Sequence, residues 1–183
     1  LRETEGSLTT FVDLDSEGSY RFPRRVAPSK YVVELLHPPA GVYIKSIHYG
    51  EQDALHGALD LTGGGVRSLD IVLSAKVGAI TGAVKDAPGI VVSAWPQVPI
   101  MAGGVKSAST DQNGSFEISD LGPGDYFVAA WEAIGADLLQ DPDFLARFKT
   151  LATRVRLDEG ARAVVEVKPI SLARVAEEAA KLP

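Results

Sequence analysis

Two tryptophans and one basic cluster are the residues best suited to recognising another molecule. Trp95 stands before Pro96 at the end of an expected strand, where an exposed indole face would stack on a sugar beside the loop 96–104. Trp131 lies inside an apolar run, which places it in the core. The basic cluster is either a solvated turn or a patch that faces an acidic neighbour or a glycan, and it consists of Arg21, Arg24, Arg25 and Lys30.

The sequence shows no complete pattern for catalysis or metal binding. Residues 111–114 begin like a calcium loop, but Gly122 stands where a bidentate Glu is required, so we interpret them as a structural turn. No serine has the G-x-S-x-G context of a hydrolase nucleophile. The spacing of the histidines matches no usual ligand pair: His37, His48 and His56. We therefore expect no enzyme activity, no metal and no cofactor.

The composition is typical of a soluble globular protein, since 45% of the 183 residues are hydrophobic and 23% are charged. The net charge of −6 argues against general nucleic-acid binding, which needs a basic surface. The absence of cysteine excludes disulfides and thiolate chemistry. No apolar run reaches the ~18 residues of a membrane span, and no signal peptide is visible. Because the chain begins at Leu1 rather than Met, we expect a processed or excised piece whose targeting signal has been removed.

The clearest structural signal lies between residues 110 and 132. Residues 111–114 predict a turn in which Asn113 or Gly114 takes a positive φ. Apolar and polar residues then alternate over 115–118, as in a half-buried strand, and a second turn leads to a longer apolar strand at 126–131. This stretch predicts a corner of an antiparallel β-meander.

Two segments predict helices. Residues 141–149 have Asp141 at the N-cap and Pro142 at the first helical position. One face of that helix is apolar and carries Phe144, Leu145 and Phe148. Residues 171–181 favour a second helix capped by Ser171, and because its apolar face is mostly alanine we expect a weakly docked tail.

Three blocks of the sequence recur at the same separation of about 95 residues, which indicates two copies of one fold. The first block holds the Asp-x-x-Gly-Ser turn, the second a Pro-x-x-Tyr strand start and the third the closing strand. The matched pairs are 15–22 with 111–118, 28–33 with 123–128, and 68–73 with 163–167.

The repeat predicts an all-β protein of two tandem antiparallel β-sandwiches, 1–76 and 77–170, followed by a tail, 171–183. The second copy opens with a strand at 77–84 that has no counterpart in the first, because too few residues precede the turn at Asp15. The first sandwich is therefore expected to have an unpaired edge. Either the chain has been cut, or a preceding domain or a neighbouring subunit supplies the strand. The strands expected in the first copy are 8–13, 19–22, 41–49, 58–61 and 68–73.

The motifs GAITGAVKD, STDQNGSF and LGPGDYFVAAWE, within residues 78–132, resemble the carboxypeptidase regulatory-like domains. The resemblance extends over most of residues 8–170. It implies a transthyretin-like or Ig-like β-sandwich of the kind found in long secreted or envelope proteins of bacteria. The family is mostly accessory or structural, so the resemblance implies no catalytic residue.

A related family of sandwiches forms Lys–Asn or Lys–Asp isopeptide bonds. Lys85 follows an opening strand, as that chemistry requires. The acid expected shortly after Tyr126 is absent, because position 130 is Ala130 and Glu132 comes late. This departure from the pattern argues against an isopeptide bond.

We predict a non-enzymatic structural or assembly piece of a bacterial secreted or cell-envelope protein, polymerising through strand addition into a filament. Its expected partners are further copies of itself or neighbouring domains, without nucleic acid and without a membrane span. Two alternatives stay open, because a fold does not determine function: an accessory module that binds a glycan or a protein, and a regulatory domain of a larger secreted enzyme.

Overall fold

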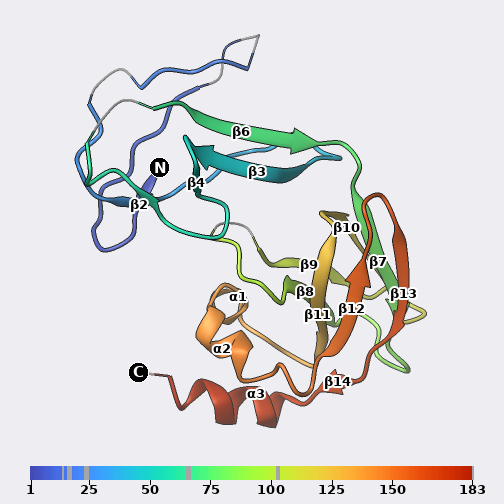
Figure 1. Ribbon diagram of the computed structural model, residues 1–183. Helices are drawn as coiled ribbons and strands as arrows, with labels where there is room; N and C mark the ends of the chain where they lie inside the picture. Colours follow the sequence, from blue (N-terminus) through green and yellow to red (C-terminus); the bar gives the residue numbers. More distant parts are fainter. Residues whose placement is uncertain (14, 16–17, 23–24, 65–66, 102–103, 183) are drawn as a thin grey trace. The chain divides into compact units, whose positions relative to one another are not determined.

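The computed structural model describes residues 1–13, 15, 18–22, 25–64, 67–101 and 104–182 (Figure 1). The chain divides into two compact units, and each is described by itself. Both consist mainly of antiparallel strands, which confirms the predicted all-β fold class. The boundary between residues 76 and 77 stays a prediction. Unit 1 comprises Leu1–Pro38, Ile44–Leu73 and Ile100–Gly103, and unit 2 comprises Pro39–Tyr43, Ser74–Pro99 and Gly104–Pro183.

The described residues of unit 1 form two three-stranded sheets. In the first sheet the order is β1 (Arg2–Glu3), β2 (Lys30–Val32) and β5 (Leu59–Asp60), and all pairs are antiparallel. In the second the order is β4 (Gln52–Asp53), β3 (Tyr43–Tyr49) and β6 (Leu69–Ser74). Among its described residues, a small core is formed by Tyr31, Val33, Ile47, Ala54, Leu55 and Leu59.

Two strands predicted in unit 1 are wrong, because residues 8–13 and 19–22 are not in strands. The segment 8–10 makes backbone hydrogen bonds to the first three residues, but only one isolated bridge results, between Arg2 and Thr9. The segment 19–22 has the alternating pattern of a strand, yet the described residues offer it no neighbouring strand. A pattern of side chains does not form a ladder without a partner for the backbone.

The described part of unit 2 is a sandwich of a three-stranded sheet and a five-stranded sheet. β7 (Gly78–Ala83) is the central strand of one sheet, antiparallel to β10 (Ser115–Leu121) and parallel to β13 (Arg162–Glu166). The other sheet has the order β12 (Thr153–Leu157), β11 (Gly124–Trp131), β8 (Val91–Pro96) and β9 (Lys106–Ser109), and β14 (Pro169–Ile170) pairs with β11. Three short helices follow β11 or β14: α1 (Ala136–Leu139), α2 (Pro142–Ala146) and α3 (Leu172–Ala179).

β11 is buried on both faces from Tyr126 to Trp131, which explains why its sequence is continuously apolar. Tyr126, Val128 and Ala130 face the core between the two sheets. The opposite face, with Phe127 and Trp131, lies against the helices. The helix residues in that second core are Leu139, Phe144, Leu145, Phe148 and Val175.

The predicted helix caps are confirmed. The carboxylate of Asp141 accepts hydrogen bonds from the N–H groups of Asp143 and Phe144, at 2.8 and 3.1 Å, and Pro142 is the first residue of α2. The hydroxyl of Ser171 caps α3 through the N–H of Arg174 at 3.3 Å. These bonds satisfy backbone donors that the first helical turn leaves free.

The turns at Asp15 and Asp111 have the same hydrogen bonds. In each, the Asp carboxylate accepts from the N–H of the serine four residues later, at 2.8 Å. In each, the glycine N–H donates to the Asp carbonyl at 3.0 Å, and φ is +78° at Gly18 and +77° at Gly114. The sequence match between these blocks thus extends to their local geometry.

A tyrosine follows each turn and makes the same contact in both units. The hydroxyl of Tyr31 donates to the carbonyl of Ala27, and the hydroxyl of Tyr126 donates to the carbonyl of Gly122, both at 2.9 Å. This bond to a carbonyl four residues upstream is the tyrosine corner of β-sandwiches. Burial raises the pKa of both hydroxyls, to about 12 for Tyr126, so both remain hydrogen-bond donors at neutral pH.

Ser93 accounts for one buried polar contact in unit 2. Its Oγ accepts a 2.8 Å hydrogen bond from Nε1 of Trp131, and both residues are 0% exposed. We expect Ser93→Ala to lower the free energy of unfolding of unit 2 by about 1–3 kcal/mol, because it leaves the indole N–H buried without an acceptor. Urea unfolding followed by tryptophan fluorescence measures this loss. Ser107, which is exposed and lies opposite Ser93 on β9, is the matched control, and Ser107→Ala should change stability by less than about 0.5 kcal/mol.

Candidate functional site

The candidate site is the free edge of β6 in unit 1 (Figure 1). β6 is the last strand of its sheet, with β3 as its neighbour among the described strands. Its sequence, LDIVLS, has a single charged residue, Asp70, and Val72 and Leu73 are 46% and 37% exposed. Edge strands of soluble proteins usually carry charges, prolines or bulges that prevent pairing with another chain. β6 has little of this protection.

The direction of the β6 backbone groups follows from one hydrogen bond. Gly50, which follows β3, donates its N–H to the carbonyl of Ser68 at 3.2 Å, so residue 68 faces β3. Because successive residues of a strand point their N–H and C=O groups to opposite sides, those of Leu69, Ile71 and Leu73 face the free edge. At Leu69 the carbonyl accepts a hydrogen bond from the hydroxyl of Tyr20. The structure assigns no partner to the outward groups of Ile71 and Leu73 within the described residues.

The edge strands of unit 2 are better protected. Each of its edge strands longer than two residues carries at least one charged side chain, and three of these four strands carry two. These charges hinder the approach of a further strand, because an added chain would have to desolvate them. The charged residues are Lys106 on β9, Glu117 and Asp120 on β10, Arg154 and Arg156 on β12, and Arg162 and Glu166 on β13.

Trp95 is not a surface platform, and that prediction is wrong. It is 5% exposed, stacks on Trp131 with ring centroids 6.4 Å apart, and lies 5.7 Å from the ring of Phe127. The helices α1 to α3, which come later in the chain, cover this face of β8 and β11. The loop 96–104 is also engaged in part, because Met101 donates its N–H to the carbonyl of Leu55 at 2.8 Å.

The predicted basic cluster is described only in part. Arg21, Arg25 and Lys30 are exposed, and Arg24 lies outside the described residues. Lys30 is opposite Asp60 in the pairing of β2 with β5. Hydrogen bonds from Thr62, together with the Lys30 ammonium, lower the pKa of Asp60. A role of these cations in binding stays a prediction.

The remaining candidates of the sequence have local structural contacts. His56 bonds to Asp53 through Nδ1 at 2.8 Å, and the described residues contain no group of three or more His, Cys, Asp or Glu side chains that could hold a metal ion. The carboxylate of Asp111 accepts two backbone N–H groups of its own turn, as the turn interpretation predicts. Lys85 is exposed.

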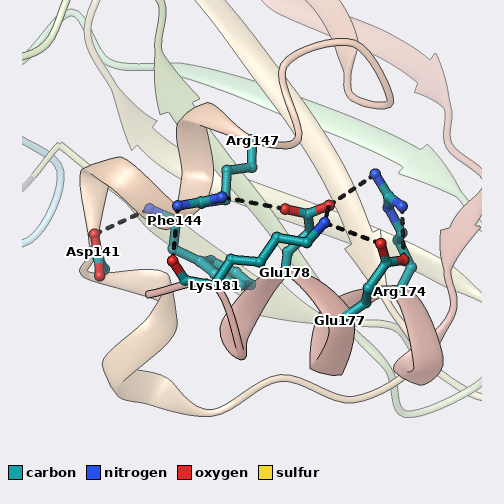
Figure 2. Close-up of polar contacts among 7 residues, drawn as sticks. All are labelled: Asp141, Phe144, Arg147, Arg174, Glu177, Glu178 and Lys181. Carbon is teal, nitrogen blue, oxygen red and sulfur yellow. Dashed lines mark hydrogen bonds and ion pairs between the residues drawn. The ribbon is translucent and has the colours of Figure 1, made fainter. Parts of the chain in front are cut away.

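A charged cluster anchors the C-terminal helix, and the sequence interpretation missed it (Figure 2). Glu178 of α3 is 5% exposed, and its carboxylate contacts three cations. Arg174 and Lys181 are each 2.9 Å away, and Arg147, which follows α2, is 3.5 Å away. Val175, 3% exposed, packs into the aromatic core beside this cluster. The expectation of a weakly docked tail is therefore wrong. The spacing of Arg174, Glu178 and Lys181, which lie on one helical face, was the available signal.

We expect the docking of α3 to weaken in acid. Hydrogen bonding to Lys181, together with the charges of Lys181 and Arg174, lowers the pKa of Glu178 below its ordinary 4.5, although burial opposes the shift. A lowered folded-state pKa contributes stability that is fully present above pH 4.5 and is lost as the pH falls through the folded value. The protection factors of the Val175 and Ala179 amides, which correct hydrogen exchange for its intrinsic pH dependence, should therefore fall below pH 4.5. In Glu178→Gln the exchange should be faster at pH 7 and lose most of this acid dependence, and an unchanged acid dependence in that variant would contradict the assignment.

No protein-family model matches the chain, and no curated protein matches it. Solved structures that this chain matches include the Bacillus anthracis TIE protein, at 15% identity over 69% of this chain with a TM-score of 0.34. A variant of BcpA, the major pilin subunit of Bacillus cereus, is 17% identical over 56% of this chain with a TM-score of 0.32. A 9R-lipoxygenase from Cyanothece is 14% identical over 53% of this chain with a TM-score of 0.25.

The chain spans only part of each of these structures, namely 23%, 34% and 16% of their lengths. At these scores the likenesses do not bear on what the chain does. Membership of the carboxypeptidase regulatory-like family stays a prediction. None of the helices in the described part of the chain has the length and apolar character that crossing a membrane requires.

Proposed function

We propose that this chain is a non-enzymatic structural module of a bacterial extracellular or cell-envelope protein, and that it assembles by strand addition at β6. The observation that carries the proposal is the free edge of β6, where Val72 and Leu73 are exposed and the backbone groups of Ile71 and Leu73 face outward. Strand addition satisfies such groups with main-chain hydrogen bonds from another segment. The resemblance of the sequence to envelope and secreted domains supports the location.

The proposal includes two tandem copies of one sandwich, 1–76 and 77–170. The matching turns at Asp15 and Asp111 and the matching tyrosine contacts of Tyr31 and Tyr126 support it. A complete copy beside an incomplete one would give the chain one acceptor edge. Repeated addition at such an edge builds an open chain of subunits when the contact is head-to-tail.

Light-scattering mass and negative-stain microscopy test the proposal. We expect species well above the 19.4 kDa of one chain, with a mass that rises with concentration, or filaments. A mass of one chain at every concentration up to the millimolar range, with no filaments, would contradict self-assembly.

A further inference from the structure

We propose that unit 1 accepts an extended protein segment of the β7 type between residues 19–22 and β6, and that Tyr20 closes this position while it is empty. The inference rests on the proposed function, because it names the kind of segment that the free edge binds. We call the place between residues 19–22 and β6 the acceptor position.

The strand pairings of the two units correspond. Tyr31 on β2 pairs with β1 on one side and β5 on the other, and Tyr126 on β11 pairs with β8 and β12 in the same way. β6 follows β5 in the chain as β13 follows β12. β1 therefore matches β8, and no strand of unit 1 matches β7 within the described residues.

In unit 2, β7 fills the place between β10 and β13. Ile80 lies opposite Ile118 on one side and Ala163 on the other. Gly82 lies opposite Phe116 and Val165. In unit 1, Tyr20 and Phe22 match Phe116 and Ile118 by the turn alignment. Leu69 and Ile71, which pack against the core of unit 1, match Ala163 and Val165, which pack against the core of unit 2. The acceptor position thus has residues on both sides that match the neighbours of β7, and the described residues place no strand between them.

If unit 1 lacks an equivalent of β7, the space beside its turn at Asp15 should be more open than the space beside the turn at Asp111 in unit 2. A Cβ atom on Gly114 would lie 2.2 Å from the carbonyl oxygen of Val84, directly after β7. A Cβ atom on Gly18, which has nearly the same φ, would meet no described atom within 4 Å. No described residue therefore takes the place of β7 at the point where it would touch the turn.

Tyr20 makes a hydrogen bond in unit 1 that matches one made by β7 in unit 2. In unit 2 the hydroxyl of Thr81, on β7, donates to the carbonyl of Ala163 at 3.3 Å. In unit 1 the matching carbonyl, that of Leu69, accepts the hydroxyl of Tyr20 instead. Tyr20 also packs edge-on against Phe22, with ring centroids 6.0 Å apart. An incoming strand would have to displace this hydroxyl, so Tyr20 acts as a latch.

The surroundings of β7 define the chemistry of the segment that fits. Ile80 is 0% exposed, so its position requires an apolar side chain. A Cβ atom on Gly82 would lie 2.0 Å from the carbonyl oxygen of Val165 and 2.9 Å from the ring of Phe116, so that position requires glycine. The matching residues in unit 1, Ile71 and Tyr20, are no smaller than Val165 and Phe116. We therefore expect an extended segment with the order apolar residue, any residue, glycine.

The test uses the full chain and a synthetic peptide with the sequence of residues 78–84, GAITGAV. Binding is followed by NMR and by amide hydrogen exchange, which resolve the Ile71 and Leu73 amides. We expect both amides to shift and to become protected, and the amides of β13 to remain unchanged because the tethered β7 outcompetes a free peptide. The peptide variant Gly82→Val should not bind. Tyr20→Phe should tighten binding about fivefold, because the latch hydrogen bond no longer has to be broken.

No protection of Ile71 and Leu73 at any peptide concentration would overturn the acceptor position. Equal binding of the Gly82→Val peptide would overturn its proposed specificity, and an unchanged affinity in Tyr20→Phe would overturn the latch. The outcome is separate from that of the mass measurement. If the chain is monomeric but binds the peptide, self-assembly is refuted and the acceptor position is supported. If the chain assembles but does not bind the peptide, self-assembly is supported and the acceptor position is refuted.

Discussion

Gly114→Ala will lower the free energy of unfolding of unit 2 by about 2–5 kcal/mol, whereas Gly18→Ala will cost unit 1 about 1–2 kcal/mol. Both glycines have φ close to +78°, so the backbone strain of an alanine is the same in the two turns. The difference comes from the surroundings. At position 114 the new methyl group would lie 2.2 Å from the carbonyl oxygen of Val84, while at position 18 it would meet open space.

The unfolding of each unit can be followed with a separate probe. Trp95 and Trp131 are both in unit 2, so their fluorescence follows that unit in a urea titration. The amide exchange of Tyr31 and Val32 on β2 follows unit 1. Equal losses for the two variants would mean that a segment covers Gly18 as β7 covers Gly114. That result would contradict the incomplete first sandwich.

Leu73→Pro will weaken self-association by about tenfold or more while unit 1 stays folded. The N–H of Leu73 faces the free edge, so a proline at this position removes a donor that an added strand would use and leaves the pairing with β3 intact. Its ring also obstructs the approach of another backbone. Sedimentation or light scattering measures the association, and the exchange of the β2 amides shows whether unit 1 is folded.

Two variants control for this result. Leu73→Ala removes the side chain but keeps the N–H, and it should weaken association much less than the proline does. Val72→Pro removes an N–H that faces β3, and it should destabilise unit 1. If Leu73→Ala and Leu73→Pro weaken association equally, side-chain burial rather than strand addition holds the subunits together.

Local patterns in the sequence predicted most of unit 2. The turn at Asp111, the alternation after it and the cap at Asp141 depend on neighbouring residues, and the structure confirms all three. The two strands predicted at 8–13 and 19–22 fail for the opposite reason, because a strand depends on a partner that local sequence does not specify. The alternation at 19–22 is genuine, but the matching strand of unit 2, β10, pairs with β7, and the described part of unit 1 contains no equivalent of β7.

The sequence predicted the candidate site only indirectly, through a strand missing from the first copy. The repeat indicated that the first copy has no opening strand, but it did not indicate which strand is left with a free edge. Trp95 was misplaced because the helices that cover it lie some 40–80 residues later in the chain, and no local feature links them. The burial of Glu178 was missed for a similar reason, since Arg147 reaches it from the end of α2.

Amide hydrogen exchange of Ile71 and Leu73, compared between dilute and concentrated chain, tests the central claim most directly. These amides face the free edge of β6, so strand addition must protect them while the amides of Asp70 and Val72, which face β3, change little. We predict that their exchange slows in step with the rise in light-scattering mass. A rising mass with unchanged exchange at Ile71 and Leu73 would place the interface elsewhere and contradict assembly through β6.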